Sequence, residues 1–206
     1  MSEPELKRPV IFAGENPMIL LYAPGSNDIV AAATYWRCVY SPEGEGNALI
    51  IWVDPAVSGR GDRAPCGLYA DNVTMALMVW TNFTQHFGPF QGRGIEDRMP
   101  QATRFFQVAE GRRQHRVTCA VGPSVIELLW QDAFDAFQTV TTPVVEGKAY
   151  EVASVVLPCA RASITIDGHT VPGEVHHPEG FFQSSAFLAF CESWVELKES
   201  ALKSQD

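Results

Sequence analysis

Turn-forming residues recur along most of the chain at intervals that are typical of short antiparallel strands. Pro24–Asp28 and Pro42–Asn47 each separate two runs that are rich in apolar residues. The pair Asp167-Gly168 stands between two alternating segments, where it favours a type I′ hairpin turn. This spacing predicts a mainly β fold, built as an antiparallel meander.

The pattern predicts about ten strands. Sequential antiparallel strands in this number close into a barrel or pack as a sandwich, because both arrangements limit the exposed edges of the sheet. The strands are expected at 18–22, 29–40, 48–53, 104–109, 115–121, 124–130, 139–145, 150–157, 163–166, 169–171 and 182–197.

One segment departs from the strand pattern and predicts a single amphipathic helix over 71–87. Its apolar residues recur at spacings of three and four, which places them on one helical face. Asp71 or Asn72 supplies the N-cap, and Gly88-Pro89 ends the helix. Polar loops flank it at 56–65 and 90–100, so we expect the helix to cover one end of the sheet. Its apolar face would carry Val73, Ala76, Leu77, Trp80, Phe83 and Phe87.

This order of elements resembles, at the level of the fold, the calycin group of lipocalin-like barrels. The resemblance spans most of the chain and implies a barrel that holds a small apolar ligand. The lipocalin G-x-W signature near the first strand is absent, and Thr34-Tyr35-Trp36 stands there instead. No family residue is therefore carried over to this sequence.

The composition favours one folded domain over 1–206, with a polar tail at 198–206 that we expect to fray. Hydrophobic residues make up 46% of the chain, which is enough for a sizeable core. The net charge is -9 and no basic stripe is visible, so nucleic acid and anionic membranes are poor partners. The first residues lack the basic-then-apolar order of a secretion signal, and a cytoplasmic location is expected.

The five cysteines are spread along the chain without a CxxC pair, so we expect neither a disulfide framework nor a zinc ribbon. The sequence has no H-x-H or H-E-x-x-H spacing, and no nucleotide-binding or nucleophile-elbow motif. We therefore expect no metal and no cofactor.

Aromatic residues are the main sign of a ligand site. In a barrel of this size the interior is either filled by side chains or holds one small ligand. The rings then either fill the core or line a pocket, with the helix as its lid or floor. The candidates for ligand binding are Trp36, Trp52, Trp80, Trp130, Arg37, Leu77 and Phe83, and Trp194 lies near the end of the chain.

Polar residues on otherwise apolar strands are the candidates for catalysis. Glu127 shares a strand face with Val125 and Leu129, so it either points into a cavity as an acid or base or lies outward on an edge. Glu192 has the same two interpretations. Asp54 follows a buried strand and either lies at a pocket rim or caps a turn. Glu174 and His176 share a face, which allows a carboxylate-oriented histidine, or they lie in an exposed turn.

Three hypotheses about function remain open at this point. The first is a module that binds a small hydrophobic molecule in an aromatic-lined pocket. The second is a cofactor-independent lyase, isomerase, cyclase or hydratase that uses Glu127, Asp54, Glu174 or His176 on an apolar substrate. The third is an interaction subunit with an exposed apolar patch, and a homodimer is left open.

Overall fold

A computed structural model describes residues 9–59, 64–97, 100–179 and 183–197, and it confirms that the protein is mainly β. The strands are β1 (Val10–Glu15), β2 (Met18–Tyr22), β3 (Ile29–Tyr40), β4 (Gly46–Val53), β5 (Cys66–Ala70), β6 (Gln101–Ala102), β7 (Arg104–Glu110), β8 (Gln114–Val121), β9 (Ser124–Ala133), β10 (Phe137–Thr141), β11 (Val144–Val145), β12 (Lys148–Ile166), β13 (His169–Thr170) and β14 (Ala186–Glu196). The helical segments are α1 (Pro55–Ser58), α2 (Val73–Asn82) and the 3-10 turns η2 (Thr84–His86) and η3 (Gly88–Phe90).

The strands form one sheet whose order departs from a simple meander. Hydrogen bonds connect them in the order β6-β5-β4-β3-β1-β14-β12-β9-β8-β7. The last strand, β14, is therefore inserted between β1 and β12, where it pairs antiparallel with both. The two ends of this path, β6 and β7, are separated in the chain only by Thr103. The two end strands of the path therefore follow one another directly in the chain.

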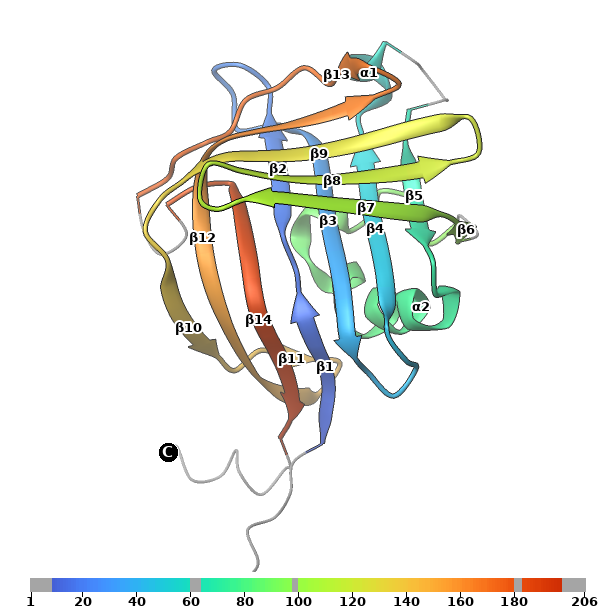
Figure 1. The fold of residues 1–206 in the computed structure, drawn as a ribbon, viewed down its shortest axis with the longest axis vertical. Helices are drawn as coiled ribbons and strands as arrows, with labels where there is room; N and C mark the ends of the chain where they lie inside the picture. The colour runs from blue at the N-terminus through green and yellow to red at the C-terminus, as the bar shows by residue number, and fades with distance from the viewer. Residues whose placement is uncertain (1–8, 60–63, 98–99, 180–182, 198–206) are drawn as a thin grey trace, which may run out of the picture.

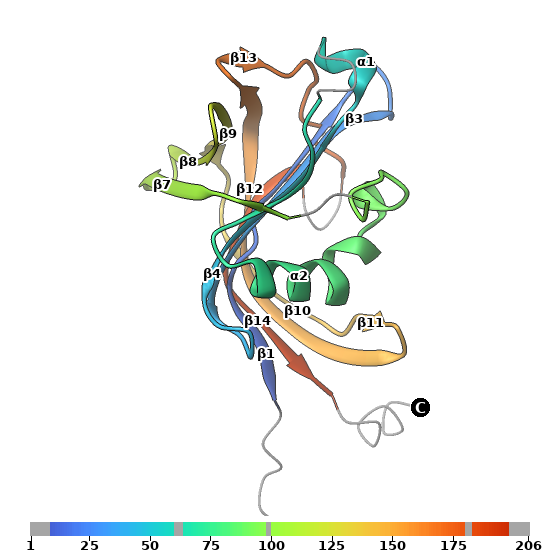
Figure 2. The ribbon, with the colours of Figure 1, turned by 90° about the vertical axis from the view of Figure 1, so that its right-hand side faces the viewer.

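The long strand β12 is what turns one part of the sheet over the other. Its first half pairs with β14 and β10, and its second half, from Cys159 onward, pairs with β9. Pro158 lies at the change of partner, as expected for a proline within a strand. In Figure 1, β7, β8 and β9 cross in front of β3, β4 and β5, and Figure 2 shows the two groups as separate layers.

One hydrophobic core fills the space between these two layers. It includes Tyr35 and Leu49 from the first layer and Val117 and Leu128 from the second, all almost fully buried. Trp130 is completely buried in this core, and its indole Nε1 donates a hydrogen bond of 3.0 Å to the carbonyl oxygen of Met18.

A second core lies on the opposite side of β3 and β4, where α2 covers the sheet (Figure 2). Trp36 is completely buried there, and its ring stacks on Phe83 at a centroid distance of 5.7 Å. Phe83 also contacts Trp194 at 4.2 Å. The indole nitrogen of Trp36 has no hydrogen-bond partner within the described residues.

The predicted helix is present but shorter than 71–87. The side-chain oxygen of Asn72 accepts a hydrogen bond from the amide of Met75, which confirms the N-cap, whereas Asp71 accepts from Asn47. The helix ends at Asn82 because Thr81, Asn82 and Thr84 are weak helix formers and Phe83 leaves the helical conformation with φ −131°. The chain then continues as η2 and η3 rather than as one helix.

Other local expectations have mixed outcomes. The hairpin at Asp167-Gly168 is confirmed, since both residues have the positive φ values (51° and 80°) that a type I′ turn requires. The segment that was expected to be only a polar loop contains α1, which Asp54 caps. The expected frayed tail at 198–206 lies outside the described residues. No helix in the described part of the chain combines the length and hydropathy needed to cross a bilayer.

Candidate functional site

A β-bulge in β14 determines which way its polar residue points. Phe190 pairs with Val155 and Ser193 pairs with Ala153, so Cys191 and Glu192 together lie opposite the single residue Ser154. Cys191 adopts φ 51°, which a non-glycine residue rarely does within a strand.

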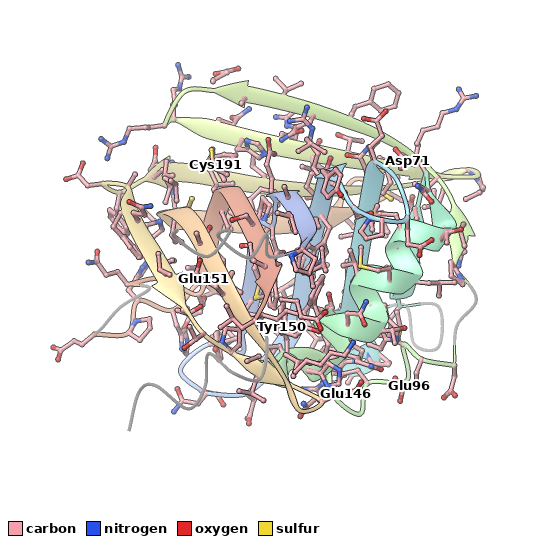
Figure 3. All side chains as sticks on the ribbon, turned by 90° about the horizontal axis from the view of Figure 1, so that it is seen from below. Asp71, Glu96, Glu146, Tyr150, Glu151 and Cys191 are labelled. Atoms are coloured by element: carbon pink, nitrogen blue, oxygen red, sulfur yellow. The ribbon has the colours of Figure 1, made fainter. Side chains whose placement is uncertain are left out.

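The bulge exchanges the two faces of β14. Leu188 and Phe190 pack into the core between the layers, whereas Trp194 packs into the core beneath α2. A strict period of two would put Glu192 on the same face as Leu188 and Phe190. The extra residue places Glu192 beside Trp194 instead and leaves Cys191 exposed. Figure 3 shows Cys191 on the side of the sheet nearer β7–β9, while Tyr150 of β12 lies on the side of α2.

Glu192 lies in a cleft of about 410 Å³ on this second face of the sheet. Strands β10, β12 and β14 form its wall, and Phe87 and Pro89 of the segment after α2 form its other side. This volume falls within the range of ordinary small-molecule sites. Most of its surface is apolar, and it is lined by Asn16, Met18, Phe87, Pro89, Thr139, Thr141, Pro143, Val152, Ser154, Val156, Phe187, Ala189, Glu192 and Trp194.

The carboxyl group of Glu192 is almost completely buried, with 7% of the residue exposed. Its Oε1 accepts a hydrogen bond of 2.7 Å from the indole nitrogen of Trp194 and a longer one of 3.4 Å from Asn16 Nδ2. Burial raises the pKa of Glu192 from 4.5 to about 7, although these two donors and the nearby Ser154 hydroxyl act to lower it. Near neutral pH the group can therefore hold or release a proton.

Asn16 is held so that its amide nitrogen faces Glu192. It lies between β1 and β2, and its backbone nitrogen donates to the carbonyl of Ala189 at 2.9 Å. Its side-chain oxygen accepts a hydrogen bond of 2.5 Å from the Thr34 hydroxyl. Because the oxygen is occupied by a donor, the Nδ2 group is the end directed at the carboxylate.

Ser154 is the second polar group at this end of the cleft. Its residue is 5% exposed, and its hydroxyl oxygen has no hydrogen-bond partner of normal geometry within the described part of the protein. A buried hydroxyl without a partner is unusual, because its desolvation is not compensated. Glu192 and Ser154 lie opposite each other at the β14 bulge, and we call this pair the polar end of a cleft whose surface is mostly apolar.

The four residues proposed for catalysis do not line this cleft, and each has a structural partner. The side chain of Asp54 caps α1 by accepting a hydrogen bond of 2.8 Å from Ala56 N. Glu127 lies 3.6 Å from the guanidinium of Arg116 on the neighbouring strand β8. Asp54 and Glu127 therefore lie outside the cleft, each beside a neighbouring group, and their catalytic roles stay predictions.

Glu174 and His176 lie together, as their shared face predicted, at 3.9 Å between Oε1 and Nε2. Glu174 also accepts a hydrogen bond of 3.2 Å from Gly25 N, and the His176 ring stacks on Tyr22 at 4.0 Å. These contacts tie the loop after β13 to the turn after β2. Neither residue lines the cleft, and a catalytic role for this pair stays a prediction.

The residues proposed for ligand binding also lie elsewhere. Trp36, Trp130 and Phe83 are completely buried within the two cores. Trp80, on α2 itself, is 8% exposed and packs into the second core. The ring of Trp52 is covered by the guanidinium of Arg93 at 3.7 Å. Arg37 pairs with Glu15 at 2.8 Å, and Leu77 is 43% exposed on the outer side of α2. The segment that follows the helix lines the cleft through Phe87 and Pro89, and a ligand-binding role for the seven predicted residues stays a prediction.

A separate polar cluster lies where β1 meets β7 and β8. Gln107 Nε2 donates to Glu15 Oε2 at 2.8 Å and lies 3.0 Å from His115 Nε2. Burial lowers the pKa of His115, while the charge of Glu15 acts to raise it. The Nδ1 atom of His115 is buried without a partner in the described structure. This cluster joins strands, and none of its three residues lines the cleft.

No protein-family model, curated protein or solved structure matches the chain. Its site must therefore be interpreted from its own geometry. Within the described residues, no group of three or more His, Cys, Asp or Glu side chains is arranged to hold a metal ion.

Proposed function

We propose that the protein binds a small, mainly apolar molecule in the cleft between β10, β12, β14 and the segment after α2. The observation that carries this proposal is an apolar cleft of about 410 Å³ with a single buried carboxyl group at one end. Ligand sites typically combine an apolar lining with a few well-placed polar groups.

The aromatic signal in the sequence supports the same proposal, although through other residues than expected. Trp194 and Phe187 of β14 and Phe87 after α2 supply the aromatic surface of the cleft. The sheet, whose ends meet at Thr103, is compatible with a lipocalin-like barrel, and we retain that fold as part of the proposal. A cytoplasmic location stays a prediction.

Thr141 offers a direct test because it is exposed and lines the cleft from β10. Thr141→Trp would place a large ring in the cleft without disturbing the core. The measurement is fluorescence titration with the neutral apolar dye N-phenylnaphthylamine. We expect the wild-type protein to bind the dye and Thr141→Trp to bind it at least about tenfold more weakly.

The neighbouring residue Val140 provides the matched control. It is 59% exposed and points to the opposite side of β10, so Val140→Trp adds the same ring outside the cleft. Dye binding should be unchanged in this variant. Equal binding by both variants, or no binding by the wild-type protein, would overturn the proposed function.

A second candidate function is cofactor-independent acid–base catalysis by Glu192. The observation that favours it is the hydrogen bonding of the carboxyl group: Oε1 already accepts from Trp194 and Asn16, so Oε2 can gain or lose the proton while these contacts persist. In this mechanism Glu192 Oε2 removes a proton next to the carbonyl of an apolar ketone and returns it to the resulting enolate.

Deuterium exchange into a small apolar ketone in D₂O, followed by NMR, tests this second function. Exchange should be catalysed by the wild-type protein and lost in Glu192→Gln. It should be retained in Glu127→Gln, which removes a carboxyl group outside the cleft. Equal exchange by the wild-type protein and Glu192→Gln would refute a role for this carboxyl group.

A further inference from the structure

We infer that the ligand of the cleft carries a protonated amino group, which pairs with Glu192 and Ser154 at the polar end, and an apolar body that fills the rest. This inference rests on the proposed function and narrows it to one chemical class, lipophilic amines. Three features of the cleft support it: the hydrogen bonds to Glu192, the charges around it and the unpaired hydroxyl of Ser154.

The hydrogen bonds around Glu192 suit its ionised form. Trp194 Nε1 can only donate, and Asn16 Nδ2 is directed at the carboxyl group because Thr34 occupies the amide oxygen. Donors of this kind stabilise a carboxylate, and neither can accept a hydrogen bond from the O–H of a neutral carboxylic acid. The site is therefore arranged to hold a negative charge on a group that is almost fully buried.

The described residues that line the cleft supply no positive charge to balance this carboxylate. The described lining residues include no lysine, arginine or histidine. Burial raises the pKa of Tyr150, and the nearby negative charges of Glu196 and Glu146 act in the same direction. A buried carboxylate is costly without a counter-ion, and a cation on the ligand would supply one.

Ser154 fits the second requirement of an ammonium group. A primary ammonium has three N–H donors and no acceptor. The Ser154 hydroxyl acts on Glu192 as a donor, and its oxygen accepts no hydrogen bond within the described residues, so it can accept one of these bonds beside Glu192. Thr139 also lines the cleft, and a threonine hydroxyl can accept a hydrogen bond. Aromatic rings such as Trp194 favour a nearby cation in addition to apolar groups.

The same charges disfavour an anionic ligand. A fatty acid would bring a second carboxylate next to Glu192, and like charges at short distance repel strongly in a poorly solvated site. The volume of the cleft corresponds to a ligand of roughly a dozen non-hydrogen atoms, if each occupies about as much space as a water molecule. Decylamine, decanol and decanoate have this size and differ only in the head group.

These three compounds test the inference when each is used to displace N-phenylnaphthylamine at neutral pH, below the concentration at which it forms micelles. We expect the wild-type protein to bind decylamine about tenfold to a hundredfold more tightly than decanol, as a charged hydrogen bond in a buried site predicts. Decanoate should bind most weakly. The preference for decylamine over decanol should disappear in Glu192→Gln and persist in Glu127→Gln, which makes the same change of net charge outside the cleft.

The outcomes separate this inference from the proposed function. Equal affinities for decylamine and decanol, or tighter binding of decanoate, would overturn the inference that the ligand is an amine. The proposal that the cleft binds apolar molecules would still stand. A preference for decylamine that persists in Glu192→Gln would also overturn it, because general surface charge would then be the cause. If the dye itself does not bind to the wild-type protein, the proposed function fails first.

Discussion

Replacing Glu192 with glutamine should make the protein more stable at alkaline pH and change how its stability depends on pH. Glutamine preserves the shape of the side chain, and its carbonyl oxygen can still accept from Trp194 and Asn16. Its amide can donate to the unpaired hydroxyl of Ser154. The substitution therefore removes the titratable group without leaving a new buried polar atom unpaired.

The magnitude follows from the pKa of Glu192, which burial raises from 4.5 to about 7. Each pKa unit corresponds to about 1.4 kcal/mol, so ionisation of this residue costs the folded state about 3 kcal/mol once the pH is above 7. The folded state keeps the proton over a range in which the unfolded state has already lost it. The contribution of Glu192 to the stability of the folded state is therefore fully present below pH 4.5 and is lost as the pH rises through about 7.

Urea unfolding followed by tryptophan fluorescence at several pH values measures this effect. The free energy of unfolding of Glu192→Gln, relative to the wild-type protein, should increase by about 2–3 kcal/mol between about pH 5 and about pH 8. Glu127→Gln, which alters a partly exposed ion pair with Arg116, should show no such trend. A constant difference between Glu192→Gln and the wild-type protein across this range would refute the view that Glu192 is buried in the cleft.

Three further predictions concern the cores, the bulge and the second polar cluster. Trp130→Phe should destabilise the protein by about 1 kcal/mol more than Trp36→Phe in urea unfolding, because Trp130 loses a buried hydrogen bond to Met18 and the Trp36 nitrogen has none to lose. Cys191→Gly should stabilise the bulge by about 1 kcal/mol relative to Cys191→Ala in thermal unfolding, since glycine adopts positive φ without strain; equal stabilities would contradict this. Because burial lowers the pKa of His115, the neutral side chain stabilises the folded state above about pH 6.5. This contribution to stability is lost as the pH falls through the pKa that His115 has in the folded state. In a Glu192→Gln background, His115→Gln should therefore reduce the decrease in the free energy of unfolding below about pH 6.5, as measured by urea unfolding. An unchanged decrease would contradict this role of His115.

The prediction from sequence worked best where the determining interactions are local. The hairpin at Asp167-Gly168 was predictable because two adjacent residues tolerate the positive φ values of that turn. The N-cap at Asn72 was predictable because its partner, Met75, lies three residues away. The end of α2 was harder to predict, because the apolar spacing continues to Phe87 while the backbone leaves the helix at Phe83.

The candidate site was predicted less well because its features depend on residues far apart in the chain. Glu192 was recognised as a polar residue on an apolar strand, with both an inward and an outward orientation open. No pattern in the sequence favoured it over Glu127, which occupies an equally apolar strand and pairs with Arg116. The tryptophans were a true sign of a large apolar interior, but most of them fill the two cores.

The sequence by itself determined the mainly β character, the approximate position of the amphipathic helix and several turns, because hydrophobic period and backbone preference act over a few residues. The tertiary structure alone decided that β14 lies between β1 and β12. It also decided that Cys191 and Glu192 share one partner, Ser154, which is nearly forty residues earlier in the chain. That bulge turns Glu192 to the face of Trp194 and into the cleft, because one extra residue in a strand exchanges its two sides.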